Sequence, residues 1–303
     1  MKPKIIAVVG PTATGKSDAA VAIAEALATN GVGSEIISAD SRQVYRGLDL
    51  GTGKITTEEM RGVPHHLLDV ADPTETYTVA EYTRDAKKVL YEIIERGNVP
   101  IVCGGTGLYI DALLFDQEFP EVPPNTELRE QLEQLPTDEL IEQLRELDEE
   151  RLETIDVHNR VRVIRAIEIA EALGSVPKLS EKESPYDVIW IGLDTETATL
   201  EARIATRLKK RMDAGMREEA TLLHANDLSF DRMESLGLEY RYLARLLQNE
   251  ITEDLFYTEL ATKILQYAKR QRTWFKRNKE IEWFDATSSE TTKNILAKVT
   301  TLF

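Results

Sequence analysis

The sequence predicts an α/β fold in which helices flank a parallel sheet and an all-helical domain is inserted into the core. Three observations carry this prediction. Apolar segments alternate with helical patterns over residues 1–115, which is typical of parallel sheets. The stretch 116–185 then contains no strand candidate, and an apolar segment returns at residues 188–193. We therefore expect a core of residues 1–115 and 186–303, with residues 116–185 inserted as a helical domain.

The first strand, expected at residues 5–9, ends in a phosphate-binding motif. Residues 10–17 fit the P-loop pattern G-x-x-x-x-G-K-[ST], and an Ala-, Val- and Ile-rich helix is expected at residues 18–28. The glycines let successive N–H groups point into one concavity, and the helix start adds its positive dipole end. A glycine-rich turn with a chance lysine is the alternative, but every fixed position and both flanks match. The predicted phosphate-binding residues are Gly10, Pro11, Thr12, Ala13, Thr14, Gly15, Lys16 and Ser17.

Two side chains of this motif have separate predicted tasks. Lys16 would bring a positive charge to phosphate oxygens, and Ser17 would offer a hydroxyl ligand to Mg²⁺. The motif thus predicts a P-loop NTPase-like core that binds a phosphorylated ligand. A small-molecule kinase that uses ATP, a transferase with a diphosphate leaving group and a nucleotide-dependent switch all need the same anion cradle. The motif therefore leaves these three functions open.

A second strand is expected at residues 35–39 and is followed by Asp40. Ligands of open parallel sheets sit beyond the carboxyl ends of the strands, so Asp40 should lie near the P-loop. An aspartate here also commonly caps a turn, and the sequence favours neither role. The glycine-rich segment 47–54 is interpreted as a connector. His65 and His66 lack a carboxylate at a helical ligand spacing, which favours a structural or substrate-lining role over metal binding.

An amphipathic helix at residues 77–96 leads into a third buried strand at residues 100–103. The following loop, Gly104–Tyr109, is again glycine-rich and should face the ligand side of the sheet, where Thr106 offers a hydroxyl. A tight turn is the alternative interpretation. The strand holds the only cysteine, Cys103, which is expected to be buried and inert and which excludes an internal disulfide.

Residues 126–172 of the predicted insertion have apolar residues at helical spacing and change from acidic to basic along the chain. Arg162 and Arg165 are three residues apart, so they should share a helix face. Most charged helix faces are simply solvated. That interpretation stays open beside a binding role.

The chain returns to the sheet with a fourth strand at residues 188–193. A long helix follows at residues 199–225, in which arginines recur every four residues and form one basic stripe: Arg203, Arg207 and Arg211. Such a stripe is more suggestive beside a phosphate site than alone.

The remainder of the chain is expected to be helical. Within it, segment 269–277 combines lysines and arginines with Trp274 and Phe275. Basic and aromatic residues together bind phosphate backbones and stack on unpaired bases. The segment is therefore interpreted as a nucleic-acid contact.

Composition limits the class of protein. The 303 residues are 42% hydrophobic and 30% charged, and no apolar run approaches the ~20 residues of a membrane span. The net charge of −16 argues against an indiscriminate nucleic-acid binder but leaves room for a local basic groove. The first residues run straight into a predicted strand, which predicts no signal peptide. With the single cysteine, this indicates a cytoplasmic protein without membrane contact.

Six blocks follow one another in the chain: GPTATGKS, IISADSRQVYRGLDLGTGK, VPHHLLD, GGTGLY, RVIRAIE and AKRQRTWF. In this order they resemble the tRNA dimethylallyltransferase family, also called tRNA isopentenyltransferases. The resemblance extends from residue 4 to about residue 285 and is far more specific than a P-loop. It implies transfer of a dimethylallyl group from its diphosphate to N6 of the adenosine just 3′ of the anticodon in tRNA, with Mg²⁺. An ATP-dependent small-molecule kinase is the alternative.

The resemblance also implies roles for individual residues. The P-loop would hold the diphosphate, with Mg²⁺ on Ser17 and added positive charge from Arg207. Catalysis would rest on Lys16, on Asp40 as general base toward the adenine N6, and on Thr106 where base and donor meet. The implied tRNA contacts are Asp40, Ser41, Arg42, Gln43, Thr106, Arg129, Val161, Arg162, Val163, Ile164 and Arg165.

The implied partners are the anticodon stem-loop of tRNA, gripped by the inserted domain, and dimethylallyl diphosphate. A monomer is expected. The chain departs from the family pattern at Leu238, where members usually carry a tyrosine in the sequence Ile-Gly-Tyr-Lys-Glu. The departure lies outside the P-loop and does not affect Asp40 or Thr106.

Overall fold

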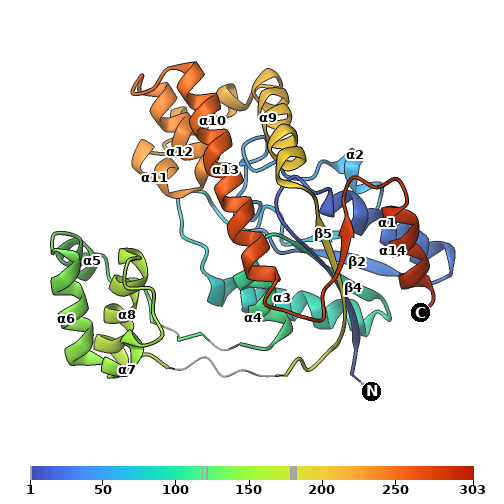
Figure 1. Ribbon diagram of the computed structural model, residues 1–303, viewed down its shortest axis with the longest axis horizontal. Coiled ribbons are helices and arrows are strands. Elements are labelled where there is room, and N and C mark those ends of the chain that lie inside the picture. Colours follow the sequence, from blue (N-terminus) through green and yellow to red (C-terminus); the bar gives the residue numbers. More distant parts are fainter. Residues whose placement is uncertain (1, 118, 121, 178–182) are drawn as a thin grey trace. The chain divides into compact units, whose positions relative to one another are not determined.

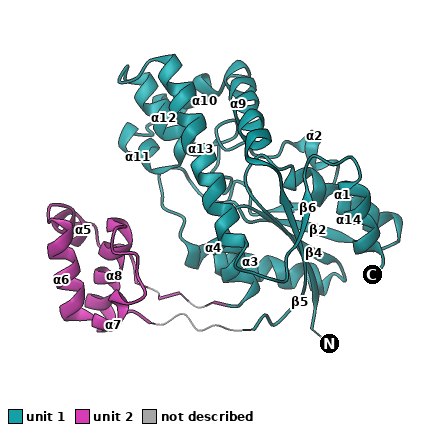
Figure 2. Cartoon of the chain, in the orientation of Figure 1, with its two compact units in different colours: residues 1–116, 183–303 teal, residues 117–182 magenta. Residues whose placement is uncertain are grey.

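The chain forms two compact units, which Figure 2 shows in separate colours. The core unit comprises residues 1–116 and 183–303, and the helical unit comprises residues 117–182. The described helices are all too short or too polar to cross a membrane. The computed structural model describes residues 2–117, 119–120, 122–177 and 183–303.

A six-stranded sheet forms the centre of the core unit (Figure 1). The described pairings between its strands are parallel, and the strands follow the spatial order β3-β2-β4-β1-β5-β6. The predicted α/β fold with a parallel sheet is therefore confirmed. The strands are β1 (Lys4–Val9), β2 (Ser34–Ser38), β3 (His65–His66), β4 (Val99–Gly104), β5 (Asp187–Asp194) and β6 (Glu282–Asp285).

Helices cover both faces of the sheet, which explains why its central strands are apolar throughout. The side chains of β1 alternate between the faces. Ile5, Ala7 and Val9 pack with α3 (Val79–Glu95) and α4 (Gly107–Leu114). Ile6 and Val8 pack on the other face with α1 (Lys16–Thr29) and α14 (Thr291–Thr300). Because both faces are buried, the sequence of the strand shows no polar alternation.

A third apolar cluster joins the helices between β5 and β6 with buried residues of the segment after β2, among them Val44 and Leu48. In α9 (Thr197–Asp213), the buried residues Leu200, Ile204 and Leu208 form one stripe, and the three arginines form the stripe beside it. The predicted helix 199–225 is in fact two helices, separated at Gly215, whose φ of 105° no helix tolerates. The other helices of this cluster are α10 (Met216–Ala225), α11 (Phe230–Ser235), α12 (Leu238–Leu247) and α13 (Glu253–Phe275).

The two edge strands differ from the prediction. The expectation that the chain is helical throughout after the fourth strand is wrong for β6, which pairs with β5. The other edge strand, β3, follows the short helix α2 (Thr57–Met60). It pairs with β2, and His66 Nε2 lies 2.6 Å from Glu35 Oε2. Burial by itself would raise the pKa of Glu35, but hydrogen bonds from Arg96, Asn98 and His66 lower it to about 2. His66 therefore holds the edge of the sheet.

The helical unit is built from four described helices that pack around their own leucines. Leu132, Leu140 and Leu144 are buried against Val163 and Ile167. The helical pattern predicted over residues 126–172 is thus confirmed, although turns divide it. The helices are α5 (Thr126–Glu133), α6 (Thr137–Leu147), α7 (Glu149–Leu152) and α8 (Arg160–Leu173).

Candidate active site

A cleft of about 1040 Å³ opens in the core unit at the carboxyl ends of the strands. It is lined by the P-loop after β1, by Asp40 and Gln43 after β2, by Gly104 and Gly105 where β4 ends, and by Leu193 of β5. The strands are parallel, so segments far apart in the sequence meet at one edge of the sheet. The P-loop and Asp40 therefore lie together, as the sequence predicts.

The P-loop bends closely around its own backbone. Gly10 has a φ of 140°, and a Cβ at this position would lie 2.1 Å from the carbonyl oxygen of Leu193, so only glycine fits beside β5. Within the loop, Thr14 Oγ1 and Lys16 Nζ both donate to the carbonyl of Pro11, at 2.8 and 2.7 Å. The loop leads into the N-terminus of α1, where backbone N–H groups favour an anion.

Lys16 and Ser17 lie side by side at the start of α1 and both line the cleft. Burial lowers the pKa of Lys16 to about 8, although the negative charge of Asp40 opposes the shift. The ammonium is therefore mostly protonated at pH 7 and loses its charge only in mildly alkaline solution. Ser17 is exposed to solvent in the first turn.

The three arginines of the α9 stripe all line the cleft. Arg207 Nη2 donates to Thr12 Oγ1 at 2.8 Å, which brings its guanidinium to the P-loop. Arg211 Nη1 donates to the carbonyl of Gly51 at 3.3 Å. Burial lowers the pKa of Arg207 to about 10, so it is still a cation at neutral pH. The family resemblance implies a role in diphosphate binding for Arg207 alone. The four-residue spacing already indicated that Arg203 and Arg211 lie on the same face of the helix.

Asp40 has the turn-capping role that the sequence leaves open. Its Oδ1 accepts hydrogen bonds from the backbone N–H groups of Arg42, at 2.9 Å, and Gln43, at 3.4 Å. The same carboxylate lines the cleft and lies near enough to Lys16 to affect its pKa. The described hydrogen bonds of Asp40 use Oδ1 only, so a turn cap and a carboxylate that faces the cleft are compatible.

Ser41, Arg42 and Thr106 lie beside the cleft and are not among the residues that line it. The backbone N–H of Ser41 donates to Thr106 Oγ1 at 3.0 Å, and the N–H of Thr106 donates to the carbonyl of Ala39 at 3.1 Å. These bonds join the loops after β2 and β4. Tyr267 of α13 also hydrogen-bonds with Thr106, and burial raises the pKa of Tyr267 to about 12, so its hydroxyl keeps its proton.

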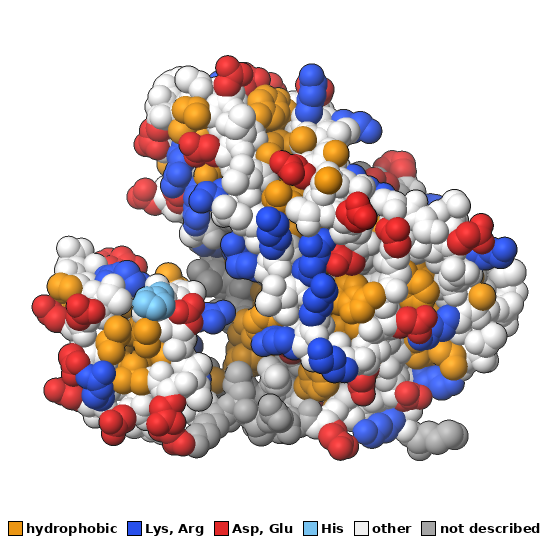
Figure 3. All heavy atoms as spheres, in the orientation of Figure 1, with side chains coloured by type: hydrophobic (Ala, Val, Ile, Leu, Met, Phe, Trp, Pro, Cys, Tyr) orange, Lys and Arg blue, Asp and Glu red, His pale blue; other side chains and the backbone are white. Residues whose placement is uncertain are grey.

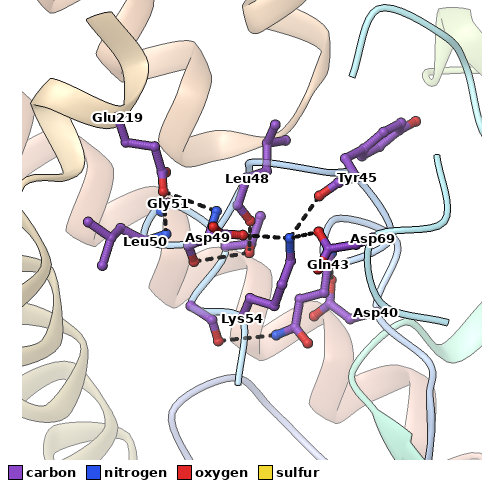
Figure 4. A network of polar contacts seen from close by, with 12 residues as sticks. Asp40, Gln43, Tyr45, Leu48, Asp49, Leu50, Gly51, Lys54, Asp69 and Glu219 are labelled. Carbon is purple, nitrogen blue, oxygen red and sulfur yellow. Dashed lines mark hydrogen bonds and ion pairs between the residues drawn. The ribbon is translucent and has the colours of Figure 1, made fainter. Parts of the chain in front are cut away.

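The glycine-rich segment 47–54 contributes to the lining of the cleft. It is anchored by Lys54, whose polar contacts Figure 4 shows. The side chain of Lys54 is 6% exposed, and its Nζ donates to Asp49 Oδ1 at 2.6 Å and to Asp69. A third bond, to the carbonyl of Tyr45 at 2.8 Å, completes its donor capacity. The segment is therefore a fixed wall of the cleft and more than the connector expected from the sequence.

Glu219 of α10 holds the same segment through its backbone (Figure 4). The carboxylate accepts hydrogen bonds from the N–H groups of Leu50, at 2.7 Å, and Gly51, at 3.0 Å. The hydroxyl of Tyr240 donates to it at 2.6 Å. The N–H groups of this glycine-rich segment are therefore already bonded to a carboxylate of the protein. Unlike the P-loop, the segment is not expected to bind a phosphate through them.

The basic and aromatic segment 269–277 is only partly available to a nucleic acid. Phe275 is buried against the sheet, and Arg272 is bound to Asp194 at 2.7 Å. The expectation of a nucleic-acid contact is therefore wrong for these two side chains. Figure 3 shows Lys and Arg side chains gathered over α13. The exposed cations of the segment are Lys269, Arg270, Lys276 and Arg277.

Sequence reasoning missed Gln271 of the same segment, which is 6% exposed and contacts the P-loop. A signal for it exists in the sequence. Ile264, Ala268 and Phe275 are buried at spacings of four and seven residues, and Gln271 falls on the same face of α13. A polar residue at a core position of a helix indicates a specific hydrogen-bond partner.

Two of the predicted RNA contacts in the helical unit are bound to an internal carboxylate. Glu168 of α8 is 1% exposed and receives Arg129 and Arg165 as ion-pair partners. The backbone N–H of Asn125 also donates to it, at 2.5 Å. Burial by itself would raise the pKa of Glu168, but these partners lower it. Arg129 and Arg165 therefore have a structural task in addition to any contact with RNA.

The other predicted contacts of this unit differ in accessibility. Val163 and Ile164 are buried in the core of the unit, so their side chains are not available to a ligand. Val161, which is 77% exposed, and Arg162 lie on the surface in the first turn of α8. The accessible part of the predicted contact is thus the first turn of α8.

The cleft fits a magnesium ion that keeps most of its own water. Among the described residues there is no group of three His, Cys, Asp or Glu side chains that could hold a metal by themselves. Mg²⁺ is usually bound through one or two protein ligands together with substrate phosphates. Ser17, the last residue of the P-loop, lines the cleft with an exposed hydroxyl and suits that mode.

A P-loop, a stripe of arginines and a carboxylate around one cleft define a P-loop protein that acts on a phosphorylated ligand. Comparison with known proteins narrows this class. The model of the IPP transferase family matches residues 43–278. The chain belongs to the IPP transferase family.

Relatives match nearly the whole chain. The tRNA dimethylallyltransferase of Bacillus mycoides is 38% identical and covers 97% of this chain and 94% of its own length. The tRNA dimethylallyltransferase of Anoxybacillus flavithermus is 39% identical, and the match covers 95% of this chain and 92% of the relative's length. The solved structure of a tRNA isopentenylpyrophosphate transferase from Bacillus halodurans has a TM-score of 0.74 and 35% identity, covering 99% of this chain and 96% of its own. These matches confirm the resemblance and the P-loop NTPase-like fold and give no support to a kinase.

Proposed function

We propose that this protein transfers the dimethylallyl group of dimethylallyl diphosphate to N6 of the adenosine just 3′ of the anticodon in tRNA. The bond between the allylic carbon and the diphosphate oxygen breaks, a bond from that carbon to N6 forms, and N6 gives up a proton. The observation that carries this proposal is the single cleft lined by both the P-loop and Asp40. One side suits a diphosphate, and the other offers a proton acceptor.

The donor side of the cleft stabilises the leaving diphosphate. Lys16 and Arg207 would place cationic groups at its oxygens, and the N–H groups at the start of α1 would complete the cradle. Mg²⁺, held by Ser17 and the phosphates, would neutralise further negative charge when bound. Lys16 and Arg207 are already held at the P-loop by hydrogen bonds to Pro11 and Thr12, so little reorganisation of these two groups accompanies charge development.

The acceptor side would receive the adenine. An exocyclic adenine amine is a weak nucleophile, so a carboxylate that accepts its proton assists the attack. Asp40 is one of the carboxylates that line the cleft, and it lies near enough to Lys16 of the P-loop to affect its pKa. The base must leave its stack to reach this point. Thr106, bonded to Ser41, would support the loop on which the adenine lies.

The proposed activity can be tested directly with two labels. Unmodified tRNA is incubated with the protein and Mg²⁺, in one reaction with dimethylallyl diphosphate labelled in the allyl group and in another with ATP labelled at the γ-phosphate. We expect label in tRNA from the first reaction only. Transfer of phosphate from ATP to any acceptor, without prenylation of tRNA, would instead favour the kinase.

The KM for dimethylallyl diphosphate is expected to rise above pH 8. Burial holds the pKa of Lys16 at about 8, and only the protonated ammonium attracts the diphosphate. The KM should be constant below about pH 7 and rise by up to about tenfold per pH unit well above the pKa. Steady-state kinetics from about pH 6.5 to about pH 9.5 measures this. In Lys16→Arg the cation persists, so the profile should be flat; a flat wild-type profile contradicts the assignment.

Replacing Arg162 by alanine should raise the KM for tRNA and leave that for the donor nearly unchanged. Arg162 is exposed in the first turn of α8, and loss of one phosphate contact should lower the slope of log affinity against log salt by about one. Arg165 is kept, because it neutralises the buried Glu168. The control is Arg145→Ala, an exposed arginine on α6 of the same unit. If both variants bind tRNA equally, Arg162 is merely solvated.

A further inference from the structure

Gln271 joins the two loops that the proposed function assigns to the two substrates. The backbone N–H of Thr12, in the P-loop, donates to Gln271 Oε1 at 2.8 Å. Gln271 Nε2 donates to the carbonyl of Gly105, in the loop after β4, also at 2.8 Å. One buried amide therefore bridges a residue of the donor loop and the residue that precedes Thr106.

The glycines of the loop after β4 have no side chain, which allows α13 to approach the loop closely. A Cβ on Gly105 would lie 2.2 Å from Gln271 Nε2, and a Cβ on Gly107 would lie 2.2 Å from Trp274 Cδ1. Neither position has a positive φ, so the backbone conformation does not require glycine there. Close packing against α13 does, and it brings the amide within reach of both loops.

Thr12 is held from two directions. Its N–H is bound to Gln271 of α13, and its hydroxyl accepts from Arg207 of α9 at 2.8 Å. A side-chain amide suits the bridge because it carries both groups at one end. Its oxygen accepts from Thr12, and its nitrogen donates to Gly105. A carboxylate supplies the acceptor without the donor, and an apolar side chain of the same size supplies neither.

We propose that Gln271 is a positioning residue that sets the P-loop against the Thr106 loop, and so sets the donor against the adenine. This inference rests on the proposed function. Reacting atoms must approach to about 3–3.5 Å, and a misplacement of about 1 Å costs about 100-fold in rate. Loss of the bridge therefore affects the chemical step more than the binding of either substrate.

Three variants of the full chain test this role. Gln271→Met keeps the volume and removes both hydrogen bonds. Gln271→Glu keeps the acceptor for Thr12 and removes the donor to Gly105. The matched control is Thr273→Ala on the exposed face of the same helix, where the hydroxyl bonds only to the carbonyl of Lys269 among the described contacts.

We expect Gln271→Met to lower kcat about 10–100-fold, with the KM for tRNA nearly unchanged, and Thr273→Ala to behave as wild type. Gln271→Glu, which keeps the size of the side chain and the bond to Thr12, should also have a lower kcat. That result would show that the bond to Gly105 is needed in addition to the volume of the side chain. Activity is expressed per folded molecule, from thermal unfolding of each sample. A Gln271→Met enzyme with wild-type kcat per folded molecule would overturn the proposal.

A second measurement needs no substrate. Amide hydrogen exchange of the full chain should be faster in Gln271→Met at residues 10–17 and 104–107 and unchanged elsewhere. In Gln271→Glu only the second segment should loosen. Unchanged exchange in both segments, or faster exchange throughout the core unit, would reject the bridge as a positioning device. Failure of the wild-type protein to prenylate tRNA would refute the proposed function and leave this result standing by itself.

Discussion

Replacing Asp40 by alanine is expected to lower kcat about 10²–10⁴-fold, the usual contribution of one general base. The KM for dimethylallyl diphosphate should change little, because the P-loop and the arginines of α9 remain in place. Asp40 lines the cleft beside Lys16, and its described hydrogen bonds engage Oδ1 only. Single-turnover prenyl transfer at saturating tRNA measures the effect on the chemical step.

Asparagine at position 40 separates the two roles of the aspartate. The amide oxygen can still accept from the N–H groups of Arg42 and Gln43, so the turn is kept, but the amide cannot take a proton from N6. Asp40→Asn should therefore be nearly as slow as Asp40→Ala while unfolding at the wild-type temperature. If Asn restores most of the rate, Asp40 only orients the adenine. If Ala prevents folding and Asn is fully active, the turn cap is its whole role.

Replacing Lys16 by methionine should lower kcat/KM for dimethylallyl diphosphate about 10²–10³-fold, the range found for loss of one preorganised group that stabilises developing charge. Lys16 is the lysine of the P-loop, and its Nζ lies within the cradle, 2.7 Å from the carbonyl of Pro11. Methionine keeps the stem of the side chain and removes the charge. Affinity for inorganic diphosphate, measured by calorimetry, should fall as well.

The matched control is Lys209→Met, which removes an exposed lysine from α9. It changes the net charge of the protein equally but leaves the cleft intact, so both kinetics and diphosphate affinity should match wild type. Equal loss in the two variants would mean that overall charge, and not the P-loop lysine, governs donor binding. Wild-type kinetics in Lys16→Met would remove Lys16 from the catalytic residues.

The sheet and the P-loop were predictable because their signals are local. Residues 5–9 and 188–193 are apolar runs buried on both faces, and a P-loop pattern lies within consecutive residues. The edge strands lack such a signal. β3 spans only two residues, and β6 reads Glu-Trp-Phe-Asp, with its ends exposed and its middle half-buried. Their pairing with β2 and β5 defines them, and pairing cannot be seen in a short segment.

The candidate site was predictable where a local motif or the shared edge of parallel strands indicates it, as for the P-loop and Asp40. Thr12 and Gln271 are 259 positions apart, and their hydrogen bond depends on how α13 packs. Composition misled at Phe275, because an aromatic residue among cations can equally continue the buried stripe of a helix. The positive charge of Arg165 indicated a surface contact, but its guanidinium forms an ion pair with the buried Glu168, one turn further along α8. In each case a tertiary contact decides between surface and interior.

The central place of β1 in the sheet bears on how the protein matures on the ribosome. Ile6 pairs with Ile101 of β4 on one side and with Ile189 of β5 on the other. Translation adds about 5–20 residues per second, so β5 is synthesised roughly ten seconds or more after β1. Until then one edge of β1 has no pairing strand. The helical unit is synthesised within that interval, and its described apolar cluster is formed by its own residues. A nascent chain that ends before β5 also lacks Leu193, against which Gly10 packs. The phosphate cradle, encoded first, is thus among the last features of the enzyme to become functional.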